Sequence, residues 1–202
     1  PVTIMWEGIS QYDNAIVARP NYIPPDTMGA VGGTQYFETA NGVYSIYDKS
    51  TGAQLKLTSD TNWWGSVGQP VAANGDSRVM YNADAKRWIV MSFAGSVANL
   101  QIAVSDTDDA MGSWKSTQFT GFAGGTADYP TLALDKTSVY IGTNNFKVGC
   151  NPFNLTSNSF CGTTLNVIPL DSLFNNSTPT VANMKQFVNT YTYGFGADVD
   201  QG

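Results

Sequence analysis

The sequence predicts an all-β fold, on three observations. Residues that favour strands and tight turns (Gly, Thr, Ser, Asn, Val, Tyr) are abundant, whereas glutamate occurs only as Glu7 and Glu38. Short runs in which apolar and polar residues alternate recur between turn signals such as Asn41-Gly42. Helical periodicity is weak throughout, and one short helix is expected over residues 171–174, with Asp171 as its cap. We therefore expect a succession of antiparallel hairpins.

The expected strands are separated by turn residues, including Gly52, Asn74-Gly75 and Gly124-Gly125. Runs such as residues 43–49 alternate between two faces, as half-buried antiparallel strands do. The full set covers residues 35–40, 43–49, 53–59, 77–82, 87–94, 100–106, 114–119, 131–135, 138–144, 164–170 and 184–189.

An internal repeat organises these strands. Asp26, Asp76 and Asp128 each precede a strand of small apolar residues, at spacings of 50 and 52 residues, and about four strands follow each aspartate. A period near 50 with four strands per unit is typical of a β-propeller, whereas a β-sandwich would explain the similarity as accidental. We prefer the propeller, with blades at residues 26–75, 76–127 and 128–195.

These units are too few for a ring, because a propeller needs roughly 4 to 8 blades. Residues 196–202 begin a further blade, and residues 1–20, with the run 2–9, are expected to supply a ring-closing strand. The chain is therefore expected to provide about three to four blades of a larger ring. A missing C-terminal part or a second chain would complete that ring.

Four phrases of the chain carry a family resemblance. PPDTMGAVGG (24–33), GDSRVMYNADAKRW (75–88), IAVSDTDDAMGSW (102–114) and the run that begins DYPTLALD (128–135) resemble, in order and spacing, secreted bacterial β-propeller proteins of the sialidase-like/BNR-repeat type. The resemblance covers residues 24–146. Ser77 and Ala110 stand where the family pattern has proline. The resemblance implies the propeller fold far more firmly than it implies an activity.

The repeated aspartates are the first candidate site. The strand nearest the axis opens each blade of a propeller, so Asp26, Asp76, Asp128 and Asp198 are expected to converge at one mouth. A Ca²⁺ ion would offset their mutual repulsion, and no organic cofactor is expected. Alternatively each aspartate only caps a tight turn. In a catalytic version Asp26 or Asp76 is the base and Asp128 tunes its pKa, with Glu38, another aspartate or a residue outside this chain as acid.

Three further residues are candidate ligand contacts. Trp63 and Trp64 lie in an expected loop, where they would stack on a sugar or pack between blades. Arg78 follows Asp76 and is placed to hold a carboxylate, although three arginines do not support a full sialidase arginine cluster. The run Asp106-Thr-Asp-Asp109 is interpreted as a polar turn, with a weak surface ion site as the alternative.

The cysteines, the absence of histidine and the net charge limit the function and the location that the protein can have. Cys150 and Cys161 are expected to form a disulfide in a secreted chain, whereas in a reducing compartment they would be free. The absence of histidine excludes Ser-His-Asp triads, Cys-His dyads and His-ligated zinc. A net charge of −6 gives no footprint for nucleic acid, and no apolar run is long enough for a membrane helix. We expect a secreted or cell-surface location.

Together these observations predict an extracellular binding or scaffold module that recognises carbohydrate or a cell-surface protein, with an axial calcium site. The alternative is a glycoside hydrolase or lyase that acts on polysaccharide through the axial aspartates. A component of a cell-surface assembly is a third possibility.

Overall fold

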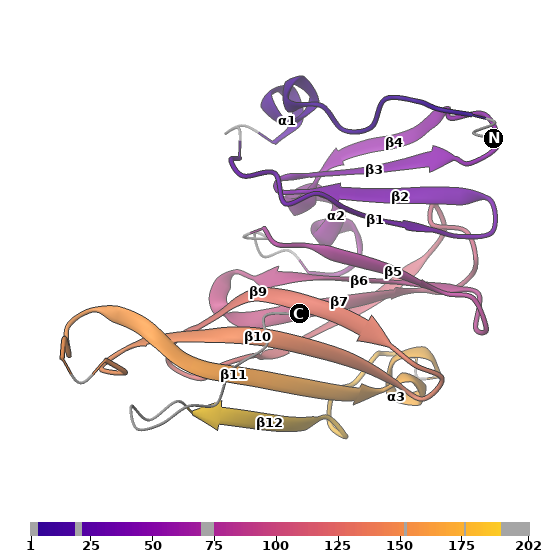
Figure 1. The fold of residues 1–202 in the computed structure, drawn as a ribbon. Helices are drawn as coiled ribbons and strands as arrows, with labels where there is room; N and C mark the ends of the chain where they lie inside the picture. The colour runs from indigo at the N-terminus through magenta and orange to yellow at the C-terminus, as the bar shows by residue number, and fades with distance from the viewer. Residues whose placement is uncertain (1–3, 19–21, 70–74, 152, 176, 191–202) are drawn as a thin grey trace.

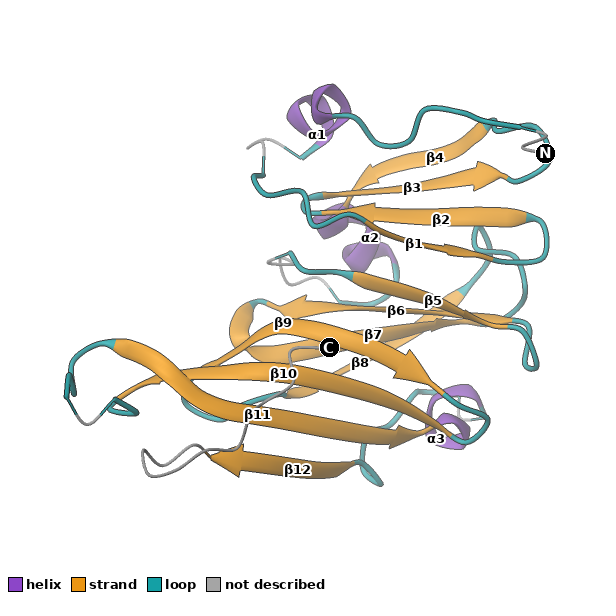
Figure 2. Ribbon diagram, in the orientation of Figure 1, coloured by secondary structure: helices purple, strands orange, loops and turns teal. Residues whose placement is uncertain are grey.

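The computed structural model describes residues 4–18, 22–69, 75–151, 153–175 and 177–190. Three four-stranded antiparallel sheets follow one another along the chain and stack face to face (Figures 1 and 2). The first holds β1 (Met28–Val31), β2 (Gln35–Ala40), β3 (Val43–Asp48) and β4 (Gln54–Ser59). The second holds β5 (Arg78–Asn82), β6 (Arg87–Ala94), β7 (Ser96–Ser105) and β8 (Trp114–Thr120). The third holds β9 (Thr126–Leu134), β10 (Ser138–Val148), β11 (Asn158–Pro169) and β12 (Lys185–Thr190).

The predicted all-β fold and its four-stranded antiparallel units are confirmed, whereas the described strands close no barrel or ring. Strand order follows chain order in every sheet, so each strand pairs with the next one along the chain. The opening strands of the three sheets are in contact, β1 with β5 and β5 with β9. This contact brings the starts of the three repeats together on one side of the stack.

An aromatic cluster joins the first sheet to the second. Phe37 and Tyr44 of the first sheet pack with Trp88 of the second, all three at most 1% exposed. Trp63 and Trp64 enter the cluster from α2 (Asp60–Ser66), which occupies the segment expected to be a loop. The Ser59 hydroxyl caps α2 by accepting a hydrogen bond from the Asn62 N–H at 3.2 Å. This short helix of about two turns buries both of the adjacent tryptophans.

A second, aliphatic core joins the second sheet to the third. Strand β6 is buried on both faces, so Trp88 and Val90 point to the first core while Ile89 and Met91 point to the second. The second core also holds Leu173 of α3 (Leu170–Phe174), the helix predicted over residues 171–174. No side chain caps α3, so the expected capping role of Asp171 is not observed.

The N-terminal segment differs from its prediction. Residues 4–10 form no strand, and they lead into α1 (Gln11–Val17), which a reciprocal Ser10–Asp13 capping box starts. Trp6 packs against Tyr36 and Tyr47 with ring centroids 6.2 Å away in both cases. These contacts cover the outer face of the first sheet. Where a ring-closing strand was expected within residues 1–20, the described part is therefore a loop and a helix.

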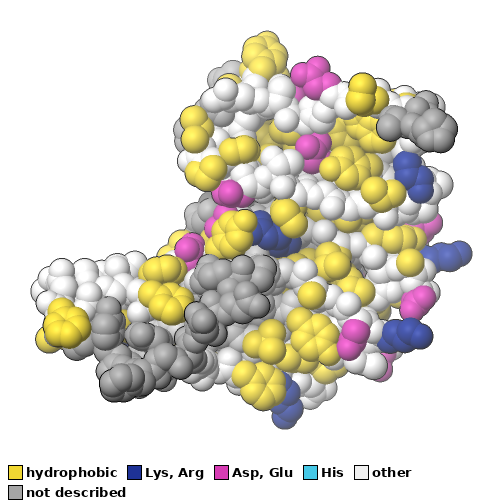
Figure 3. All heavy atoms as spheres, viewed as in Figure 1, with side chains coloured by type: hydrophobic (Ala, Val, Ile, Leu, Met, Phe, Trp, Pro, Cys, Tyr) yellow, Lys and Arg dark blue, Asp and Glu magenta, His cyan; other side chains and the backbone are white. Residues whose placement is uncertain are grey.

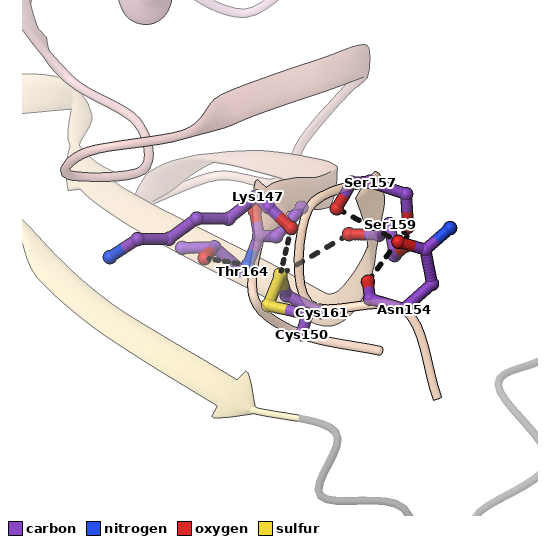
Figure 4. The surroundings of a disulfide bond; sticks show 8 residues. Lys147, Cys150, Asn154, Ser157, Ser159, Cys161 and Thr164 are labelled. Atoms are coloured by element: carbon purple, nitrogen blue, oxygen red, sulfur yellow. Dashed lines mark hydrogen bonds between the residues drawn. A yellow bond between two sulfur atoms is a disulfide. The ribbon is translucent and has the colours of Figure 1, made fainter. Parts of the chain in front are cut away.

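Cys150 and Cys161 form the predicted disulfide, with their Cα atoms 5.4 Å apart (Figure 4). The bond closes the loop between β10 and β11, which extends beyond the stacked sheets (Figure 1). In the described part of the chain, no helix has the length and apolar character needed to cross a membrane.

The Tyr44 hydroxyl gives a test of the aromatic core. It accepts a hydrogen bond from Trp64 Nε1 at 2.9 Å and lies 2.6 Å from Ser77 Oγ. Tyr44→Phe leaves these buried polar groups without a partner, so we expect the free energy of unfolding to fall by about 1 to 3 kcal/mol. Urea denaturation measures this loss. Tyr12→Phe, at a residue 73% exposed, is the control and should leave stability within about 0.5 kcal/mol of the wild type.

Candidate functional site

The opening strands begin with an unusual backbone conformation. Asp26 and Asp76 have φ angles of 40° and 51° and stand two residues before β1 and β5. In the third sheet the matching left-handed residue is Tyr129, with φ of 45°, and Asp128 lies within β9. The repeat aligned Asp128 with the other two aspartates, so the backbone equivalence is shifted by one residue. A register shift opposite this point, between Gly142 and Asn144, is the local cause.

The side chain of Asn41, in the turn between β2 and β3, holds two of these starts together. Its Nδ2 donates to Asp26 Oδ2 at 2.8 Å and to the Pro24 carbonyl at 3.0 Å. Its Oδ1 accepts a hydrogen bond from the Asp76 N–H at 2.7 Å. Gly75 packs against the same amide with φ of 94°, and a Cβ there would lie 2.9 Å from Asn41 Oδ1. The Asn41-Gly42 turn was visible in the sequence, but its second role as this bridge was not.

The three repeated aspartates influence one another electrostatically. Burial of the Asp76 carboxyl raises its pKa to about 6, and the charge of Asp26 is the next largest cause. The charge of Asp128 and a hydrogen bond with Asp26 add to this increase, while the Arg78 guanidinium opposes it. Asp76 is therefore the centre of a cluster in which the charges of Asp26 and Asp128, from the starts of the other two repeats, act on its carboxyl.

Arg78 supplies the positive charge of this cluster. It is only 3% exposed, and its Nη1 donates to the Ser77 carbonyl at 3.1 Å. Its guanidinium lies 4.6 Å from the centre of the Tyr129 ring, within cation–π range, while Tyr129 remains 48% exposed. Acidic, basic and hydrophobic side chains adjoin one another on the face drawn in Figure 3. The site thus combines carboxylates, a buried cation and one accessible aromatic ring. We name it the opening-strand site: Asp26, Asn41, Asp76, Arg78, Asp128 and Tyr129.

The positions of the acidic side chains do not directly support the predicted calcium site. Within the ranges that the structure describes, no three His, Cys, Asp or Glu side chains are grouped so that they could hold a metal ion. Asp198, the fourth predicted ligand, lies outside the described residues. A calcium ion at Asp26, Asp76, Asp128 and Asp198 therefore stays a prediction.

The Asp106–Asp109 run is a hydrogen-bonded turn. Asp106 forms an ion pair with Lys115 at 2.9 Å, and Asp108 accepts a hydrogen bond from the Tyr81 hydroxyl. Asp109 accepts hydrogen bonds from Gln35 Nε2 at 2.8 Å and from a backbone N–H of the same turn. These carboxylates have protein partners, which matches the polar-turn interpretation rather than an ion site.

Three other residues that were predicted as site residues, Trp63, Trp64 and Glu38, lie outside the opening-strand site. Trp63 and Trp64 are 1% and 0% exposed, so neither ring can stack on an external sugar, and their interpretation as ligand contacts is corrected to core packing. Glu38 is 7% exposed and accepts a hydrogen bond from the Ile9 N–H at 3.0 Å. It lies beneath the N-terminal segment, which makes it a support for that segment rather than a solvent-accessible acid.

Comparisons of the chain with protein-family models, with curated proteins and with solved structures returned no match. The chemistry of the opening-strand site is therefore interpreted from its residues.

The Asn41 bridge can be tested by truncation. Asn41→Ala leaves the Asp76 N–H without its acceptor and removes a donor to Asp26, so we expect the free energy of unfolding to fall by about 2 kcal/mol. Asn41→Asp keeps an oxygen for the Asp76 N–H but sets a second carboxylate beside Asp26. Urea unfolding of this variant should show a larger loss at pH 7 than at pH 4. A loss below about 0.5 kcal/mol in Asn41→Ala would contradict the bridge.

Because the pKa of Asp76 is raised, replacing its carboxyl should stabilise the protein by an amount that depends on pH. Because the folded protein binds the Asp76 proton more tightly than the unfolded chain does, stability falls as pH rises from about 4 through about 6. Asp76→Asn cannot ionise, so we expect it to be more stable than the wild type above pH 6, with the difference vanishing below about pH 4. Urea unfolding across this range measures the difference.

Asp135 serves as a control, because its pKa is shifted in the direction opposite to that of Asp76. Hydrogen bonds from the backbone N–H of Thr137, the Tyr140 hydroxyl and the Ser138 N–H lower the pKa of Asp135 to about 2. Asp135→Asn should therefore be less stable than the wild type at neutral pH, and the loss should shrink as pH falls toward 2. Equal behaviour of the two variants would refute the assignment for Asp76.

Proposed function

We propose that the chain is part of an extracellular β-propeller of the sialidase-like/BNR-repeat type and that its opening-strand site binds carbohydrate. The observation that carries the proposal is the contact of the buried Arg78 with the half-exposed ring of Tyr129, next to the Asp76 carboxyl, on which the charges of Arg78, Asp26 and Asp128 all act. The half-buried Asp76 carboxyl, with its raised pKa, costs stability at neutral pH. Such perturbed groups are more typical of binding and catalytic sites.

The arrangement of the sheets supports the propeller. Sheets follow in chain order, their opening strands adjoin, and the middle sheet packs on both neighbours, as blades do around an axis. On the third sheet, Leu165 and Phe187 are paired across β11 and β12 and are 41% and 60% exposed. This apolar pair is suited to packing under a further blade, supplied by more of the same chain or by a second chain.

The residue types of the site suit a sugar ring. Carboxylates accept hydrogen bonds from neighbouring hydroxyls, and an accessible aromatic ring packs against the apolar face of a pyranose. Arg78 already lies against Tyr129, which fixes the ring before a ligand arrives. Calcium bound by the aspartates would add coordination to sugar hydroxyls, and this part of the proposal is tested separately below.

A glycoside hydrolase is the second candidate, on the strength of Asp76. A carboxyl with a pKa of about 6 is partly protonated near neutral pH and can act as a general acid. The charge of Asp26 affects the pKa of Asp76 more strongly than the charge of Asp128 does, and a glycosidase needs its second carboxylate roughly 5 to 9.5 Å from the first. Asp26 and Asp128 are therefore the two candidates for the second carboxylate.

Binding to a panel of immobilised neutral and acidic oligosaccharides tests the proposal. We expect Tyr129→Asn, which keeps a residue tolerant of positive φ but removes the ring, to weaken binding about tenfold. Asp128→Asn should weaken it similarly, and Tyr12→Asn is the matched control on an exposed tyrosine elsewhere. Calcium and chelator added in parallel show whether an ion takes part, and release of reducing ends separates hydrolysis from binding.

Three outcomes would decide against parts of this proposal. Equal binding by the wild type and Tyr129→Asn would remove the opening-strand site as the sugar site. Sugar binding that is unchanged by chelator would exclude a role for calcium in that binding. Reducing-end release that persists in Asp76→Asn would remove the catalytic role of that residue.

A further inference from the structure

The loop between β10 and β11 presents exposed apolar side chains at the end of a long hairpin. Phe153 is 84% exposed, Leu155 is 63% exposed and Val148 is 56% exposed. The hairpin extends beyond the stacked sheets, so these side chains lie on a projection rather than in a groove (Figure 1). We call residues 148–151 and 153–157 the hairpin tip. An apolar projection in water indicates an interaction surface.

The backbone of the hairpin tip is hydrogen-bonded within the loop itself. The Phe153 N–H donates to Asn151 Oδ1 at 2.9 Å, and the Asn154 N–H donates to the Asn151 carbonyl at 3.1 Å. Thr156 donates to Asn154 Oδ1 from its backbone N–H at 3.3 Å and from its hydroxyl at 3.0 Å. Backbone groups paired in this way can leave water at low cost, which an apolar environment requires.

Side-chain hydroxyls near the tip are paired in the same manner. Ser157 Oγ lies 2.7 Å from Ser159 Oγ and donates to the Asn154 carbonyl at 3.1 Å. Figure 4 shows Asn154, Ser157 and Ser159 gathered beside the disulfide, while the Lys147 side chain extends away from them. The Cys150–Cys161 bond holds this conformation, so little further ordering is needed on binding.

Charge distribution distinguishes this region from the rest of the chain. The protein carries 16 acidic residues, and none of them lies within residues 137–170. Lys147 is the single charged residue of that range. The tip can therefore approach an anionic surface without the repulsion that the remainder of this acidic protein would cause.

We propose that the hairpin tip inserts into the interfacial region of a lipid bilayer, with Phe153 and Leu155 as its apolar anchors. Hydrogen bonds within the loop, exposed apolar side chains at its end and the local absence of acidic side chains all favour shallow insertion. A protein partner would need a pocket shaped for the tip, but it would not require the polar groups of the loop to be paired in advance. The opening-strand site plays no part in this inference.

Vesicle flotation with the full chain tests the inference. Vesicles of phosphatidylcholine alone and vesicles that also contain anionic phosphatidylglycerol are the probes. Phe153→Ser/Leu155→Ser should lower the bound fraction about tenfold on both. The single lysine should make wild-type binding only about fivefold tighter on the anionic vesicles. Met5→Ser/Tyr12→Ser removes two side chains of similar exposure, 88% and 73%, from another surface and should bind as the wild type does.

Each other result overturns the inference. Wild-type protein that does not float, or a tip variant that floats as well as the wild type, excludes insertion through the tip. Equal losses in both double variants would indicate general stickiness rather than a specific anchor. If the tip variant changes the mass of the free protein in size-exclusion chromatography, the tip contacts a second copy of the chain. Circular dichroism and a disulfide assay confirm that the tip variant is folded.

Discussion

The relative position of the first two opening strands depends on one amide, the side chain of Asn41. It connects the Asp26 carboxylate and the Pro24 carbonyl to the backbone of Asp76, so a single turn residue ties together the starts of two sheets that the aromatic core packs against each other. Left-handed residues before β1 and β5 are needed to turn the chain toward this amide. The carboxylates are consequently presented by rigid strand starts rather than by free loops, and this rigidity keeps Asp26 close enough to perturb Asp76.

In the opening-strand site, one buried arginine offsets part of the repulsion between the carboxylates. Arg78 is almost fully buried, yet its contacts are a backbone carbonyl and the face of an aromatic ring. It lowers the pKa of Asp76 without cancelling the increase that burial and Asp26 cause. Ser77, where the resembled family has proline, donates or accepts at the Tyr44 hydroxyl and so couples the site to the aromatic core.

Strand positions were predictable from the sequence because alternation and turn residues are local signals. Residues 35–40 and 87–94 were predicted as the structure has them, and the four-strand unit was visible from the repeat. Two failures are local, the expected Asp171 cap and the missed Ser10–Asp13 capping box of α1, and the others are not. Trp63 and Trp64 form a helix because two sheets must be filled between them, and the shift from Asp128 to Tyr129 accompanies an extra residue in β9 where it pairs with β10. Asn41 acts on residues that are distant in sequence, and no pattern within its own turn reveals that role.

The covering of the first sheet by residues 4–18 makes the two ends of the stack chemically different. One terminal sheet is shielded by the chain's own Trp6 and α1, while the other leaves Leu165 and Phe187 in solvent. A contact between two open ends would be isologous and would stop at a pair, whereas a contact of an open end with the shielded end of the next copy would be heterologous and could repeat. The state of association of the chain would therefore report which end of the stack is used.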